Sequence, residues 1–130
     1  ALVNFLTSKQ LLPGSWANAI SNQLYSIQTA TASTTQTQAG GTKITAAAVA
    51  VTTANNNDAV TMPKGYAGLE IFIANLSAAT LGVFPAVGDT MFPSAVNDVI
   101  TQTLSKNAVY KCINVTATGA ATWYQIESAT

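Results

Sequence analysis

The stretch GLEIFIANLSAATLGVF, residues 68–84, contains the two patterns that decide the fold class. In GLEIFIAN, Leu69, Ile71 and Ile73 alternate with other residues, which places them on one face of a β-strand. After the turn-forming NLSA, the run TLGVF repeats a short, mostly apolar pattern. We therefore expect two short strands joined by a tight connection.

Short strand patterns separated by turns continue on both sides of this stretch. They are KITAAAVAVTT, DAVTM, DVITQTLS, AVYKCINV and ATWYQIE. Turn signals such as NNND, PKGYAG, PAVGD, SKN and ATGA lie between them. Seven or eight strands at this spacing predict an all-β domain over residues 43–130, built as an antiparallel β-sandwich or jelly roll.

Helical periodicity is confined to residues 1–28. In SWANAISNQLYSIQ, Trp16, Ile20, Leu24 and Ile27 recur at spacings of four, four and three, on one helical face. We expect an N-terminal arm followed by a short amphipathic helix. A helix of about 13 residues is too short to be stable alone in water, so its apolar side must pack on the domain's own sheet or on another protein.

The segment TATASTTQTQAGGT, residues 29–42, contains no large apolar side chain. Such a segment cannot offset its ordering entropy by burial. We therefore predict a Thr/Ala/Gln-rich linker between the N-terminal arm and the β domain.

Composition excludes several classes of function. The 130 residues have no histidine, a formal net charge of zero and only 8% charged residues. Without histidine the commonest general base and metal ligand is missing, and zinc sites would need Cys or His clusters. The five lysines are scattered, which disfavours nucleic-acid binding, and no apolar run reaches the roughly 18 residues of a membrane-spanning helix. The single cysteine, Cys112, is expected to be a small buried side chain.

The remaining polar and aromatic residues suggest three other kinds of site: a catalytic carboxylate pair, a calcium site and a sugar-binding platform. Asp89 and Asp98 bracket one loop, where a pair of carboxylates could serve a glycosidase. The oxygen-rich runs GDT and NNND would suit calcium, but ordinary turns explain them better. Four aromatic residues could form a platform for sugars, although a core or subunit interface is favoured: they are Tyr66, Phe84, Phe92 and Trp123.

Two runs, IANLSAATLGVFPAVGDTMF and TQTLSKNAVYKCINVTATGAATWYQI, resemble a module of tailed-bacteriophage virion proteins. That module combines an N-x-x-x-x-x-L-x-V-F-P-x-x-G-D segment with a closing W-Y strand. The resemblance covers roughly residues 38–127. The matching residues are Asn75, Leu81, Val83, Phe84, Pro85, Gly88, Asp89, Trp123 and Tyr124.

The resemblance implies a structural protein of the virus particle, such as a head decoration (cement) protein or a head fibre, commonly a trimeric β domain without catalytic activity. We call Phe84, Pro85, Gly88 and Asp89 the marker loop. There we expect Phe84 to be the last inward residue of a strand, Pro85 to stop strand pairing, and Asp89 to cap the turn.

We therefore expect a non-enzymatic cement protein on the outer capsid surface, a homotrimer that binds the major capsid protein and needs no cofactor, metal, nucleic acid or membrane. The arm and helix would clamp neighbouring capsid subunits through their apolar side chains: Phe5, Leu11, Leu12, Trp16, Ile20 and Leu24. The alternatives are a carbohydrate- or receptor-binding module of a phage fibre or tail, and then an enzyme such as a depolymerase.

Overall fold

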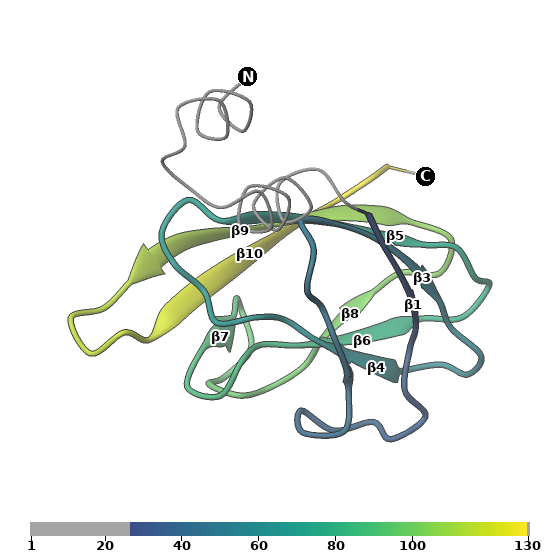
Figure 1. Cartoon of the computed structure of the whole chain (residues 1–130), viewed down its shortest axis with the longest axis horizontal. Helices are drawn as coiled ribbons and strands as arrows, with labels where there is room; N and C mark the ends of the chain where they lie inside the picture. Colours follow the sequence, from purple (N-terminus) through teal and green to yellow (C-terminus); the bar gives the residue numbers. More distant parts are fainter. Residues whose placement is uncertain (1–26, 130) are drawn as a thin grey trace, which may run out of the picture.

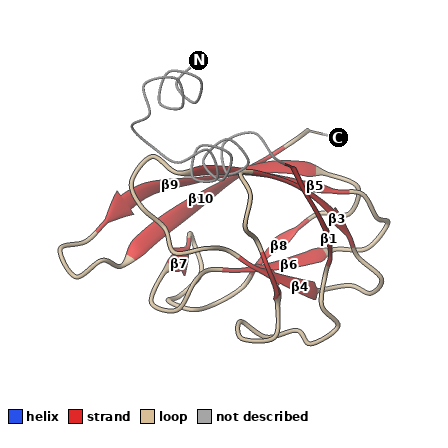
Figure 2. Ribbon diagram, in the orientation of Figure 1, coloured by secondary structure: helices blue, strands red, loops and turns tan. Residues whose placement is uncertain are grey.

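The computed structural model describes residues 27–129, which form an all-β domain of two sheets (Figures 1 and 2). The strands within this range are β1 (Ile27–Thr31), β2 (Thr42–Lys43), β3 (Ala48–Thr52), β4 (Asp58–Thr61), β5 (Glu70–Asn75), β6 (Leu81–Phe84), β7 (Thr90–Met91), β8 (Ile100–Gln102), β9 (Asn107–Val115) and β10 (Ala121–Glu127). The predicted arm and most of the predicted helix lie outside the described residues. The predicted all-β class is confirmed.

Both sheets are mixed. The larger has the order β1-β3-β5-β9-β10-β7, and the smaller has the order β2-β4-β6-β8. From β1 to β9 the chain changes sheet after every strand. The early strands of each sheet run in the same direction: β1, β3 and β5 are parallel to one another, as are β2, β4 and β6. The pairs β5–β9, β9–β10 and β6–β8 are antiparallel.

The prediction of an antiparallel sandwich is therefore wrong in its pairing, and a jelly roll is not confirmed. Turn residues indicate where the chain reverses, but not which strand it pairs with afterwards. After β3, for example, the turn through NNND leads into β4 of the other sheet instead of closing a hairpin.

The segment predicted to be a linker, residues 29–42, belongs to the folded domain. Its first residues complete β1, which pairs with β3 from Ile27 to Thr31. Ala30 and Ala32 are buried in the core cluster, and Thr42 begins β2. A strand without large side chains is stabilised here by backbone pairing and by its close fit to a neighbour, neither of which composition reveals.

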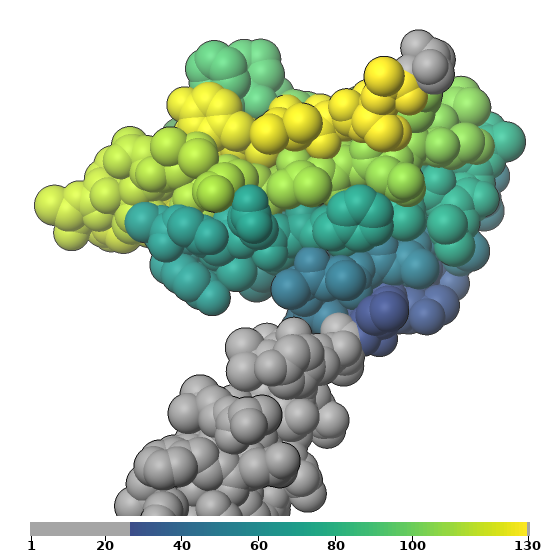
Figure 3. Space-filling model, turned by 90° about the horizontal axis from the view of Figure 1, so that it is seen from above, coloured from purple at the N-terminus to yellow at the C-terminus, as the bar shows by residue number. Residues whose placement is uncertain are grey.

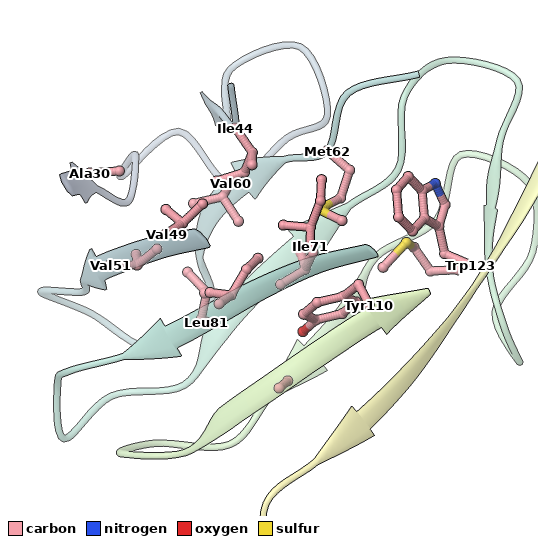
Figure 4. Packing of buried hydrophobic residues seen from close by; sticks show 14 of the residues in the cluster. Ala30, Ile44, Val49, Val51, Val60, Met62, Ile71, Leu81, Tyr110 and Trp123 are labelled. Carbon is pink, nitrogen blue, oxygen red and sulfur yellow. The ribbon is translucent and has the colours of Figure 1, made fainter. Parts of the chain in front are cut away.

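The core lies between the two sheets, and the alternation predicted for residues 69–73 is confirmed there (Figure 4). Ile71 and Ile73 of β5 are buried, and Leu69 packs against the cluster from just before the strand. Both sheets contribute to the cluster: Val49, Val51, Tyr110 and Trp123 from the larger, and Val60, Leu81 and Val83 from the smaller.

A buried polar network also joins the sheets. The Tyr110 hydroxyl in β9 donates to the side-chain oxygen of Gln102 in β8 at 2.9 Å, and it accepts from the Gln125 amide of β10 at 2.9 Å. The Gln102 amide donates to the carbonyl oxygens of Ile73 and Lys106 at 3.0 and 2.8 Å. Because buried amides are costly when unpaired, this network fixes how the two sheets align.

Candidate functional site

The marker loop follows β6 as a buried proline and a tight turn. β6 ends at Phe84, and Pro85 is buried directly after it. The Asp89 backbone N–H donates to the Ala86 carbonyl at 2.9 Å, and Gly88 has a φ of 88°, a conformation that L side chains rarely adopt. The predicted strand end and turn are confirmed. Phe84 differs from the prediction, because it is only half-buried and Val83 is the last fully buried residue of β6.

The Asp89 carboxylate is the centre of this loop. Its side chain is fully buried, whereas that of its ion-pair partner Lys64 is 52% exposed. The backbone N–H of Gly65 donates to Oδ2 at 2.9 Å, and that of Ala121 donates to Oδ1 at 2.9 Å. Asp89 thus ties together its own loop, the segment after β4 and the first residue of β10. Sequence reasoning predicted a local cap and missed this long-range crosslink.

The packing around this carboxylate leaves little free space. A Cβ atom at Gly65 would lie 2.6 Å from the Cβ of Ala121 and 3.1 Å from the sulfur of Cys112. Trp123 is fully buried here, and its indole N–H has no hydrogen-bond partner among the described residues. Burial, and secondarily the charge of Asp89, raise the pKa of the Cys112 thiol. The thiol is therefore a packed, protonated side chain, which confirms the prediction of a small buried cysteine.

The structure does not present the hypothetical carboxylate pair to solvent. Asp89 is fully buried, whereas Asp98 is exposed and accepts a hydrogen bond from the N–H of Val99 at 2.8 Å. Among residues 27–129, no group of three or more His, Cys, Asp and Glu side chains could hold a metal ion.

Asp58, in the second oxygen-rich turn, is buried and held by hydrogen bonds. Burial by itself would raise the pKa of this carboxyl, but the backbone N–H of Asn55, the side chain of Gln36 and further donors together lower the pKa below its ordinary value of 3.8. The Asn55 N–H lies 2.9 Å from Oδ2. In both oxygen-rich turns, protein donors therefore bind the carboxylate, as expected of ordinary turns.

The four aromatic residues do not form one platform. Trp123 belongs to the core, as predicted, and Phe84 is half-buried. Phe92 is 52% exposed and stacks on Tyr124 of β10, with ring centroids 4.9 Å apart. Tyr66 is 62% exposed and lies on a different part of the chain.

A pocket of about 290 Å³ lies beside the Asp89 crosslink. It is lined by Thr45, Ala46, Ala47, Pro63, Lys64, Tyr66, Leu69 and Ile71. Lys64 thus faces the pocket and also holds Asp89. From the sequence only a turn was predicted at PKGYAG, because no local pattern indicates that residues 45–47 pack against it.

In comparisons with known proteins, no protein-family model and no curated protein matches the chain. The predicted capsid-binding residues lie outside the described residues: Phe5, Leu11, Leu12, Trp16, Ile20 and Leu24. Between residues 27 and 129 there is no helix long and apolar enough to cross a membrane.

Proposed function

We propose that this chain is a structural, non-enzymatic component of a tailed-phage particle, a decoration protein that binds the outer surface of the head and stabilises the major capsid subunits as a homotrimer. The observation that carries the proposal is an apolar face: the exposed side chains of Ile27, Phe72 and Ile126 lie in one row across the larger sheet, with Ala48 and Val109 between them. A continuous apolar face on a small domain indicates assembly with other protein surfaces.

The marker loop supports the same proposal. The Asp89 carboxylate accepts from three donors and is shielded from solvent. It therefore acts as a crosslink that makes the loop rigid. In the proposed decoration protein, the residues resembling the virion module hold its fold together.

The contact with the capsid is assigned to the N-terminal arm and its predicted helix, which precede this sandwich-like domain. Three such arms on one trimer would dissociate far more slowly than a single arm, because each detached arm stays close to its site. The apolar contacts of the arm are Phe5, Leu11, Leu12, Trp16, Ile20 and Leu24.

Co-sedimentation with heads of the encoding virus, prepared without this protein, tests the proposal. The full chain is expected to sediment with the heads, whereas the double variant Phe5→Asp/Leu12→Asp should remain in the supernatant. The double variant Thr7→Asp/Ser8→Asp adds the same two charges to the arm at polar positions and should sediment like the unaltered chain. Equal sedimentation of the double variant would refute the assigned contact, and failure of the unaltered chain to bind would refute the function.

A carbohydrate- or receptor-binding module of a fibre or tail is the second candidate. The observation favouring it is the exposed Tyr66 ring at a pocket that also contains Lys64 and Thr45. Aromatic faces and polar neighbours together suit a sugar ring. Glycan-array binding by the full chain that disappears in Tyr66→Ala, but persists in the control Val87→Ala at an exposed loop residue, would favour this function over decoration.

A further inference from the structure

The outer face of the larger sheet carries one continuous apolar row. In register order, Ile27 lies opposite Ala48, Ala48 opposite Phe72, Phe72 opposite Val109, and Val109 opposite Ile126. We call these five residues the apolar row. Figure 3 views the molecule from the side of this sheet, with β10, β9, β5, β3 and β1 as successive bands from yellow to purple.

The row points away from the core. Phe72 and Val109 alternate along their strands with buried residues: Ile71 and Ile73 flank Phe72, and Ala108 and Tyr110 flank Val109. Ile27 and Ile126 are 72% and 67% exposed. A shallow groove of about 340 Å³ lies at the β5, β9 and β10 end of the row, lined partly by Phe72, Val109 and Ile126.

The charged residues in the strands of this sheet leave no unpaired charge on its outer face, because Glu70 and Lys111 pair there and Glu127 is turned toward the smaller sheet. Glu70 of β5 pairs with Lys111 of β9 at 3.3 Å. The Glu127 carboxylate accepts from the backbone N–H and the hydroxyl of Thr103, which follows β8 of the smaller sheet. The face therefore presents no unbalanced charge that would repel an identical face.

We propose that the outer face of the larger sheet is the surface through which copies of this chain associate, with the apolar row at its centre. The inference rests on the homo-oligomer of the proposed function and names the surface that forms it. It leaves the N-terminal arm free for the capsid.

The size of the face favours a second copy as its occupant. The five longer strands, spaced about 4.8 Å apart, are about 19 Å wide together, and at five to nine residues each they are about 17–30 Å long, which gives an area of about 300–600 Å². Stable interfaces bury about 800 Å² per partner, and side-chain relief adds to the flat area. The predicted 13-residue helix of the same chain, about 20 Å long and 10 Å wide, would cover only about 200 Å².

The test measures the mass of the full chain in solution by light scattering after size exclusion, over a range of concentrations. The unaltered chain is expected at a multiple of 13.4 kDa. Ile126→Asp should shift it to 13.4 kDa, or raise the dissociation constant about 30-fold or more, as for the loss of an apolar anchor residue. Val87→Asp places the same charge at a 77% exposed loop residue and should leave the mass unchanged.

Phe72→Asp provides a second disruption of the apolar row and is expected to act like Ile126→Asp. Circular dichroism checks that each variant keeps its β structure. A monomeric unaltered chain at every concentration, or oligomers that survive both substitutions, would overturn the inference. A monomer whose β5 and β9 amides are protected from exchange by residues 1–26 would also overturn it, because the chain's own segment would then cover the face.

The two proposals fail separately. A chain that oligomerises through the apolar row but does not sediment with heads contradicts the decoration function and leaves this interface intact. A monomeric chain that still sediments with heads contradicts this interface and the trimeric state, and leaves the binding to heads intact.

Discussion

Asp89→Asn probes whether the marker loop acts as a structural crosslink. The buried carboxylate accepts from Lys64 and from the backbone N–H groups of Gly65 and Ala121. An asparagine of the same shape keeps one carbonyl oxygen as an acceptor. Its amide group, however, turns N–H donors toward donors of the protein, so at least one buried N–H loses its partner.

The expected loss follows from these contacts. Removing one partner of a fully buried ion pair costs about 3–5 kcal/mol. The Lys64 side chain is 52% exposed and can regain water, which places the expected loss lower, at about 2–4 kcal/mol of unfolding free energy. For a domain of this size, each kcal/mol corresponds to about 3–5 °C in melting temperature.

Urea unfolding followed by circular dichroism measures this loss. The matched control is Asp98→Asn, which makes the same chemical change at an exposed carboxylate of the loop before β8. It should alter the unfolding free energy by less than about 0.5 kcal/mol. A loss below about 1 kcal/mol for Asp89→Asn, or equal losses for the two variants, would refute the crosslink.

Three further predictions concern other buried groups. Tyr110→Phe removes the hydroxyl between Gln102 and Gln125, so urea unfolding should show a loss of about 1–3 kcal/mol, whereas an unchanged midpoint would contradict the network. Because the pKa of Asp58 is lowered in the folded state, its carboxylate contributes stability that is present above pH 4 and lost as the pH falls through the folded-state pKa. The slope of unfolding free energy against pH below 4 should therefore be shallower in Asp58→Asn. Identical slopes for the variant and the unaltered chain would refute this. Cys112 should react with iodoacetamide only after unfolding in urea, and fast labelling of the folded chain would show that the thiol is accessible.

Much of the β pattern was predictable because alternation is a local property. Ile71 and Ile73 face the core as their spacing indicated, and Trp123 in the closing strand is buried. The turn at Gly88 was likewise predictable from the sequence, since glycine readily adopts the positive φ that this turn requires. Residues 29–42 were misjudged because the prediction required large apolar side chains for burial, while Ala30 is buried by the neighbours that β1 meets.

The site was less predictable because its partners lie far apart in the chain. Lys64 and Ala121 are 25 and 32 residues from Asp89, and no local pattern links them. The apolar row has the same character, because Ile27 and Ile126 lie 99 residues apart in the sequence. They join one surface only through the pairing of β1, β3, β5, β9 and β10.

By itself, the sequence determined that residues 43–127 form short strands and where many of the turns between them fall, because backbone propensity and side-chain alternation act over a few residues. The tertiary structure decided which sheet each strand enters, that β1, β3 and β5 run parallel, as do β2, β4 and β6, and that Asp89 becomes a buried crosslink. These outcomes depend on hydrogen bonding and packing between distant segments. The free energies of such contacts exist only once the two sheets have met.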